Sequence, residues 1–106
     1  ETVPQVTVND LAGWLEEGRD LVVIDVREPF EWREGHIPGV LPLPMREAVE
    51  RRSEVPADRP KALLCAGGLR SSTVISALKR HGIQGSYNVS GGMTAWLKAG
   101  YSVEKP

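Results

Sequence analysis

The feature that most constrains this chain is a regular alternation of short apolar runs with amphipathic, helix-like segments. The runs LVVIDV at 21–26 and KALLCA at 61–66 are apolar along most of their length, as is typical of strands covered on both faces. Segments such as RSSTVISALKRHG at 70–82 instead carry apolar residues at helical spacing. Strands that alternate with helices require right-handed crossovers. The pattern therefore predicts an α/β fold with three layers: a mostly parallel sheet of about five strands and helices on both faces.

Capping and stop signals place the individual elements. Thr7 can cap a helix over 7–18, where Asp10 suits the first turn and Gly18 the end. The other elements follow from the same apolar periods and from Pro and Gly. We expect strands at 4–6, 21–26, near 40–41, at 61–66 and at 86–90, a helical turn at 29–33, a short helix that starts at 45, and helices at 70–82 and 92–100.

Composition excludes several classes of function. Thirteen Lys and Arg balance fourteen Asp and Glu over 106 residues, which gives no electrostatic case for binding nucleic acid or an anionic membrane. The apolar runs are too short to span a bilayer. A single cysteine excludes an internal disulfide and four-cysteine metal patterns, and the two histidines lie far apart. We expect no metal and no organic cofactor.

The single cysteine, Cys65, stands where a catalytic loop is expected. Parallel sheets bind ligands beyond the carboxyl ends of their strands, and Cys65 directly follows the run ALL. The glycines of AGGL permit a tight arc whose backbone N–H groups converge on one point. Those N–H groups, the N-terminus of the next helix and the guanidinium of Arg70 would each lower the pKa of the thiol. A lone cysteine after a strand is often inert core, but inert packing needs neither the glycines nor the arginine.

Four motifs resemble the rhodanese family of sulfurtransferases. CAGGLRS has the form C-x-x-G-x-R-[ST] of that family's active-site loop, and DVREPFEW, EGHIPGV and NVSGGMTAW match in the same order, over about 5–103. The resemblance implies a rhodanese-like fold in which Cys65 is the nucleophile that forms a persulfide and Arg70 orients the sulfur-bearing group. It also implies that loop amides cradle the substrate, and the residues that supply them are Ala66, Gly67, Gly68, Leu69 and Ser71.

The length of the cysteine loop distinguishes this chain from two other classes of enzyme that share the rhodanese-like fold. Rhodanese-like phosphatases and arsenate reductases carry H-C-x-x-x-x-x-R, whereas here four residues separate Cys65 from Arg70 and Leu64 replaces the histidine. A shorter loop forms a smaller anion-binding cradle, which fits a sulfur atom better than a tetrahedral oxyanion. Many relatives that use thiosulfate also place a basic residue inside the loop, but here Ala66 and Leu69 leave Arg70 as the only loop cation. This composition favours an organic persulfide, such as glutathione persulfide, at least as much as thiosulfate.

Asp25 and Arg27 end a strand at the same predicted edge of the sheet as Cys65. Asp25 either hydrogen-bonds the loop amides or Arg70, and so supports the cradle, or it forms an ion pair that merely caps the strand end. Both readings stay open.

The remaining polar and aromatic candidates receive structural interpretations. Glu28 and Glu31 are expected to be solvated surface, and His36 to belong to a structural turn. Trp14 and Trp96 are assigned to the core, whereas Trp32 is a weaker candidate for the wall of the pocket.

The sequence thus predicts an enzyme that moves a sulfane sulfur from thiosulfate or an organic persulfide, through Cys65, to a thiol, a protein partner or cyanide. The acceptor must be external because no second cysteine is present. We expect one domain over 1–106 in the cytoplasm, since no leader or membrane segment is visible. The chain starts at Glu1 rather than Met, so the alternative is a sulfur-relay or docking domain of a larger multidomain enzyme. A third hypothesis, an inactive structural domain, predicts a buried Cys65 that ignores thiol reagents.

Overall fold

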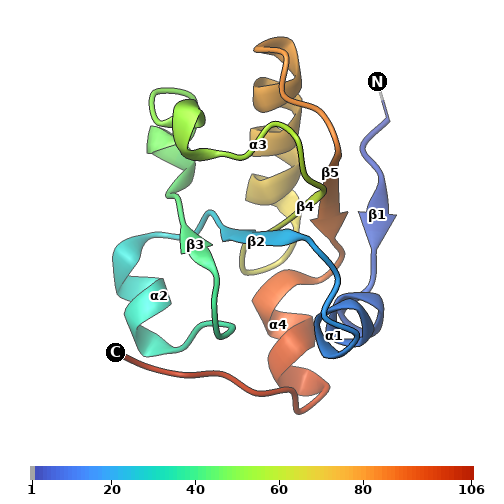
Figure 1. The fold of residues 1–106 in the computed structure, drawn as a ribbon. Coiled ribbons are helices and arrows are strands. Elements are labelled where there is room, and N and C mark those ends of the chain that lie inside the picture. The colour runs from blue at the N-terminus through green and yellow to red at the C-terminus, as the bar shows by residue number, and fades with distance from the viewer. Residues whose placement is uncertain (1) are drawn as a thin grey trace.

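Five parallel strands form the central sheet of the protein. The computed structural model describes residues 2–106, and its strands lie in the order β1-β5-β4-β2-β3 (Figure 1). Every neighbouring pair of strands is parallel. The strands are β1 (Gln5–Val6), β2 (Val22–Asp25), β3 (Leu41–Pro42), β4 (Lys61–Leu64) and β5 (Ser86–Val89). The α/β class and the parallel sheet that the alternating pattern predicted are confirmed.

The helices connect these strands and lie close to their predicted positions. They are α1 (Val8–Glu16), α2 (Pro29–Glu34), α3 (Leu69–Arg80) and α4 (Gly92–Lys98). The side chain of Thr7 caps α1 in a reciprocal arrangement with Asp10, as the sequence indicated. The predicted short helix from residue 45 is instead two 3-10 turns, η1 (Met45–Glu47) and η2 (Arg52–Glu54), in a polar stretch without a continuous apolar face.

Two hydrophobic clusters cover the two faces of the sheet, because successive strand residues point to opposite sides. Val23 and Leu64 belong to the cluster that α1 and α4 cover, which also contains Trp96 and the partly buried Trp14. Ile24, Leu63 and Cys65 belong to the second cluster, which α3 covers with Val74, Ile75 and Leu78. The sheet is therefore buried on both sides, and both tryptophans pack in the first cluster as expected.

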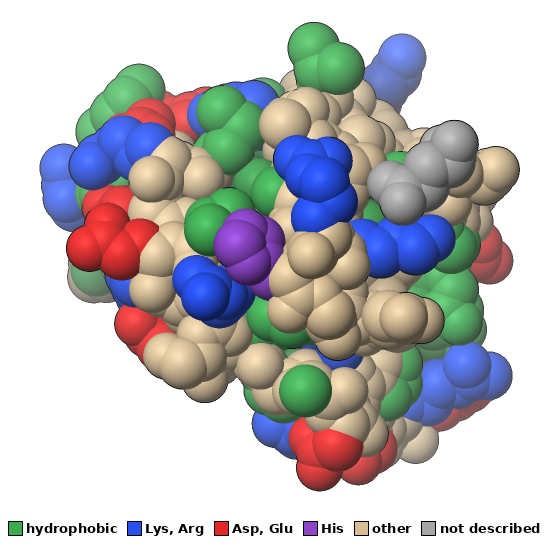
Figure 2. Space-filling view, turned by 90° about the horizontal axis from the view of Figure 1, so that it is seen from above, with side chains coloured by type: hydrophobic (Ala, Val, Ile, Leu, Met, Phe, Trp, Pro, Cys, Tyr) green, Lys and Arg blue, Asp and Glu red, His purple; other side chains and the backbone are tan. Residues whose placement is uncertain are grey.

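On the face that Figure 2 shows, side chains of one charge do not gather into a single patch. Lys and Arg side chains there are separated by apolar and uncharged atoms, and acidic side chains lie toward the margins. Within residues 2–106, no helix is both long and apolar enough to cross a membrane. In the same described part of the chain, no three His, Cys, Asp or Glu side chains gather in a way that could hold a metal ion.

Candidate active site

Cys65 lies at the carboxyl end of the central strand β4, where the chain turns into α3. Gly68 occupies the N-cap of α3 with φ 104°, a left-handed conformation that glycine adopts without strain. The turn is thus only three residues long between the cysteine and the first residue of the helix (Figure 1). The sulfur stands at the positive end of α3, at the edge of the sheet where ligands bind in parallel α/β folds.

Hydrogen-bond donors of the loop point at the sulfur of Cys65. The backbone N–H of Gly68 donates to Sγ across 3.0 Å, and the hydroxyl of Ser71 lies 3.5 Å from Sγ. Burial raises the pKa of the Cys65 thiol, but hydrogen bonds to its sulfur together lower that pKa by more, so it lies below its ordinary value. The donors are the Ser71 hydroxyl and the backbone N–H groups of Ser71, Gly68 and Gly67. This environment favours the thiolate, which is the nucleophilic form.

The Ser71 hydroxyl connects the sulfur to a buried polar chain. Ser71 Oγ also lies within hydrogen-bond distance of Oδ1 of Asn88 on β5, and Nδ2 of Asn88 donates to Gln5 on β1. A hydroxyl has one proton to donate. It can therefore serve Asn88 while Cys65 is a thiol and turn to Sγ when the thiolate forms. Neither Asn88 nor Gln5 was singled out in the sequence, since a polar pair on two short strands carries no local signal.

The N-terminus of α4 holds the carbonyl side of the cysteine loop. The backbone N–H of Met93 donates to the carbonyl of Cys65 across 2.8 Å, and that of Thr94 donates to the carbonyl of Ala66 across 3.0 Å. Gly92 makes this approach feasible, because a Cβ there would collide with the Cys65 carbonyl and stand 2.9 Å from the Ala66 carbonyl. With the loop carbonyls held by α4, the loop N–H groups are left to face the sulfur.

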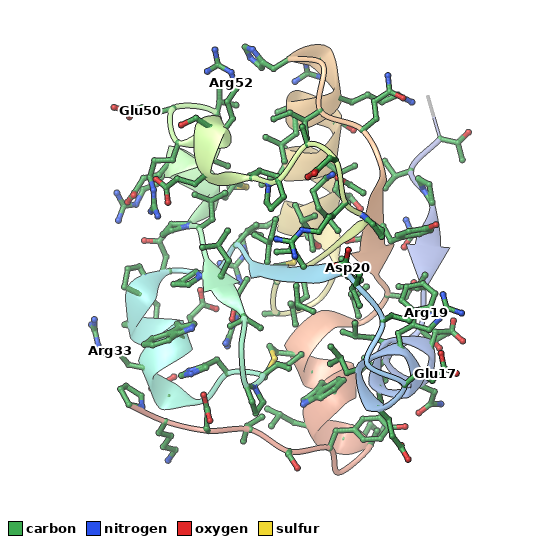
Figure 3. All side chains as sticks on the ribbon, in the orientation of Figure 1. Glu17, Arg19, Asp20, Arg33, Glu50 and Arg52 are labelled. Atoms are coloured by element: carbon green, nitrogen blue, oxygen red, sulfur yellow. The ribbon has the colours of Figure 1, made fainter. Side chains whose placement is uncertain are left out.

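Arg70 does not project freely into solvent but pairs with a carboxylate on α2. Its Nη1 and Nη2 donate to Oε1 and Oε2 of Glu31 at 2.8 and 3.0 Å, a bidentate ion pair. Other arginines, such as the labelled Arg33 and Arg52, extend outward from the fold (Figure 3). The expectation that Glu31 is solvated surface is wrong: its side chain is only 20 % exposed. Glu31 and Arg70 are 39 residues apart, so no local pattern pairs them.

Asp25 and Arg27 form an ion pair with each other rather than with the loop. The carboxylate of Asp25 accepts from Nε and Nη2 of Arg27, at distances down to 2.8 Å, and from the Arg27 backbone N–H. Arg27 also donates to the carbonyl of Gly35. Of the two readings of Asp25, the structure therefore shows the ion pair at the strand end. The contact with loop amides or with Arg70 is not among its hydrogen bonds within residues 2–106.

His36 and Trp32 form a stacked pair. Their ring centroids are 3.8 Å apart, and Nδ1 of His36 lies 2.9 Å from the carbonyl of Trp32. The backbone of His36 also bridges to Glu104, which fastens the C-terminal segment. Trp32 borders a cavity of about 380 Å³ whose lining includes Arg27 and Arg33 but no residue of the 65–71 loop. His36 thus ties the segment after α2 to the C-terminal segment, and the cavity that Trp32 borders is lined by no residue of the cysteine loop.

Comparison with known proteins supports the resemblance seen in the motifs. The model of the Rhodanese-like domain family matches residues 7–99. A protein of Allochromatium vinosum named "Sulfurtransferase" is 33 % identical over 104 residues, which is 98 % of this chain and 97 % of that protein. The crystal structure of a rhodanese-like domain protein from Staphylococcus aureus has a TM-score of 0.89 at 30 % identity, and covers 98 % of this chain and 99 % of that one.

A larger protein also contains a region like this chain. The probable adenylyltransferase/sulfurtransferase MoeZ of Mycobacterium tuberculosis is 37 % identical over 95 residues. That match includes 88 % of this chain but only 24 % of MoeZ, so the chain spans about a quarter of the length of that relative. Family model, sequence relatives and fold agree over most of the chain, and the chain belongs to the rhodanese-like domain family.

Proposed function

We propose that this chain transfers sulfane sulfur through a persulfide formed on Cys65. Membership of the rhodanese-like family supports sulfur transfer in general. The observation that carries the specific proposal is the set of loop donors that face Sγ, with the Gly68 N–H at 3.0 Å. These donors stabilise negative charge on the sulfur, whether it is a thiolate or the terminal sulfur of a persulfide. A structural cysteine in a core needs no such donors.

The burial of Cys65 bears on the alternative of an inactive domain. The residue is only 1 % exposed, which is what an inert core cysteine would show. An inert thiol in an apolar pocket would, however, have a raised pKa, whereas the pKa of Cys65 is lowered by its hydrogen bonds. The combination of a buried sulfur and a lowered pKa favours a nucleophile that a small donor reaches through the mouth of the loop.

The two half-reactions balance with no cofactor. In the first, the Cys65 thiolate attacks the outer sulfur of the donor, a new S–S bond forms, and the donor's S–S bond breaks. The leaving group is sulfite if the donor is thiosulfate, or a thiolate if it is an organic persulfide. In the second, an acceptor thiolate or cyanide attacks the terminal sulfur and restores the Cys65 thiolate. The roles of Arg70 and of the loop amides of Ala66 to Ser71 are to hold the terminal sulfur and its charge.

Steady-state turnover tests this proposal. The chain should form thiocyanate from cyanide with thiosulfate or glutathione persulfide as donor, whereas Cys65→Ser should form none above the uncatalysed rate. Turnover that persists in Cys65→Ser would contradict the proposal.

We place the reaction in the cytoplasm, where thiols remain reduced.

The match to part of MoeZ favours a second candidate, a sulfur-relay or docking domain within a larger enzyme. A relay domain would accept sulfur rapidly but release it slowly to small thiols, because its acceptor is a partner protein. Pre-loaded chain should then keep its sulfur in the presence of glutathione or dithiothreitol. Rapid discharge to either thiol would favour the free-standing enzyme.

A further inference from the structure

We propose that Glu31 sets the donor preference of the site: by pairing with Arg70 it neutralises the loop's only cation and disfavours thiosulfate relative to an organic persulfide. This inference rests on the persulfide chemistry proposed for Cys65. Glu31 lies on α2, outside the loop that carries Cys65.

The carboxylate of Glu31 is fixed from two directions. Both of its oxygens accept from Arg70, at 2.8 and 3.0 Å, and Oε1 also accepts from the backbone N–H of Glu28 across 2.9 Å at the start of α2. Its pKa is lowered from 4.5 to about 2, chiefly by the hydrogen bond from Arg70, so the carboxylate is charged at neutral pH. Arg70 therefore faces a full negative charge in this ion pair.

Arg70 is the second residue of α3, and in the chain it stands between two donors to Sγ, the Gly68 N–H and the Ser71 hydroxyl. The pKa of Arg70 is raised first by its hydrogen bond to Glu31 and, to a smaller extent, by Cys65. From this position in the loop, we place the approach of the donor, and the departure of its leaving group, next to the Arg70 guanidinium and its partner carboxylate.

Arg27 and Arg46 follow β2 and β3 at the same carboxyl-end edge of the sheet, and both are already paired. Arg27 is bound by Asp25, and Arg46 is paired with Glu28 at 3.2 Å. The residues that precede Arg70 and Glu31 in the chain are apolar and exposed, Leu69 at 80 % and Phe30 at 59 %. At this edge of the sheet these arginines are thus neutralised, and two exposed side chains are apolar.

The charge of the leaving group decides which donor this mouth suits. Attack on thiosulfate expels sulfite, which carries two negative charges next to the reacting sulfur. Attack on an organic persulfide expels a thiolate, which carries one negative charge there. With Glu31 ionised, Arg70 is already neutralised and gives little net attraction to a dianion. The organic persulfide depends less on that attraction at its reacting sulfur, because only one negative charge develops there.

Removal of the Glu31 charge tests this inference. In Glu31→Gln, kcat/KM for thiosulfate divided by kcat/KM for glutathione persulfide should rise about tenfold, the effect of one unit charge on a dianion across a partly hydrated gap. Glu34→Gln removes the same charge from an exposed position on the same helix and should leave the ratio within about twofold. Glu31→Asp keeps the charge and should keep the wild-type ratio. Raising the salt concentration should shrink the gain of Glu31→Gln, because screening weakens charge effects at an open mouth.

The outcomes separate this inference from the proposed function. If Cys65 gains no sulfur from either donor in the unaltered chain, the persulfide proposal itself fails. If both donors load Cys65 but Glu31→Gln changes their rates by the same factor, Glu31 only supports the fold and the inference is overturned. An equal rise of the ratio in Glu34→Gln would also overturn it, since the effect would then come from overall charge. Unfolding temperature, measured on each variant, identifies a variant that has lost its structure. If Glu31→Gln is such a variant, the salt dependence of the ratio in the unaltered chain carries the test. Because Arg70 is already neutralised there, the ratio should change little with salt, and a steep fall of the ratio would overturn the inference.

Discussion

At the scale of single residues, the reactivity of Cys65 depends on a balance between its burial and the donors that face its sulfur. Burial alone would raise the pKa of the thiol and make it inert, whereas the Ser71 hydroxyl and the loop N–H groups lower that pKa by more. Because the largest of these lowering contributions comes from one hydroxyl, a single substitution should shift the balance measurably.

On the acid limb of the pH profile, Ser71→Ala should slow alkylation of Cys65 by iodoacetamide about fivefold, the equivalent of one hydrogen bond of about 1 kcal/mol to the thiolate. The alkylation rate of both proteins should fall as acid protonates the sulfur, and the variant's fall should come at a higher pH. Ser76→Ala, on the same helix and away from the sulfur, is the matched control. A variant whose pH profile coincides with that of the unaltered chain would show that Ser71 does not stabilise the thiolate.

The Glu31–Arg70 pair makes a separate prediction about stability. The pKa of Glu31 is lowered from 4.5 to about 2 in the folded chain, so the pair stabilises the fold above pH 4.5, and this contribution is lost as pH falls from about 4.5 to about 2. The difference in free energy of unfolding between the unaltered chain and Glu31→Gln should therefore shrink across that range. Urea titrations at several pH values measure it, and a difference that does not change with pH would contradict the assignment.

At the scale of elements, the loop is shaped by two helices that meet at its ends. α3 supplies donors to the sulfur, and α4 takes the carbonyls of Cys65 and Ala66 with its first N–H groups. A substitution at the close approach of Gly92 should therefore affect stability and chemistry together.

Gly92→Ala should lower the free energy of unfolding by about 2–4 kcal/mol and abolish most sulfur loading, because its Cβ would displace the Cys65 carbonyl. Gly100 also has a positive φ, of 83°, but no atom stands within 4 Å of its would-be Cβ. Gly100→Ala should therefore cost about 1 kcal/mol and leave loading intact. Equal losses in the two variants would show that backbone strain, and not contact with the loop, is the cause.

Local patterns were sufficient to predict the strands and the four α-helices, though not the two 3-10 turns after residue 45, and they did not predict how distant elements meet. Apolar runs placed β2 and β4 to within a residue or two, and Thr7 with Asp10 placed the start of α1. The partnership of Glu31 with Arg70 was missed, because it joins α2 to α3 through side chains whose neighbours carry no shared signal. Asp25 was left between two readings for the same reason: a carboxylate at a strand end has several partners within reach until the chain is folded.

At the scale of the whole molecule, a single sheet lies between two hydrophobic cores, one on each of its faces. Leu11 of α1 and Leu78 of α3 are both fully buried, on opposite faces of the same strands. Leu11→Ala and Leu78→Ala should each lower the free energy of unfolding by about 2–5 kcal/mol and shift one cooperative transition. Leu97→Ala, at a residue that is 55 % exposed, should cost less than about 1 kcal/mol. Two separate transitions in either core variant would show that the two faces unfold independently.

The same sheet brings the candidate site together, because the carboxyl ends of β2 and β4 lie at one edge and α2 and α3 both begin there. The central claim is that this edge presents Cys65 as a carrier of sulfane sulfur. The most direct test is the intact mass of the chain after brief exposure to thiosulfate and, separately, to glutathione persulfide, with Cys65→Ser alongside. We predict one added sulfur atom that cyanide removes and that never appears on Cys65→Ser. No added sulfur from either donor, or an equal addition to Cys65→Ser, would contradict the claim.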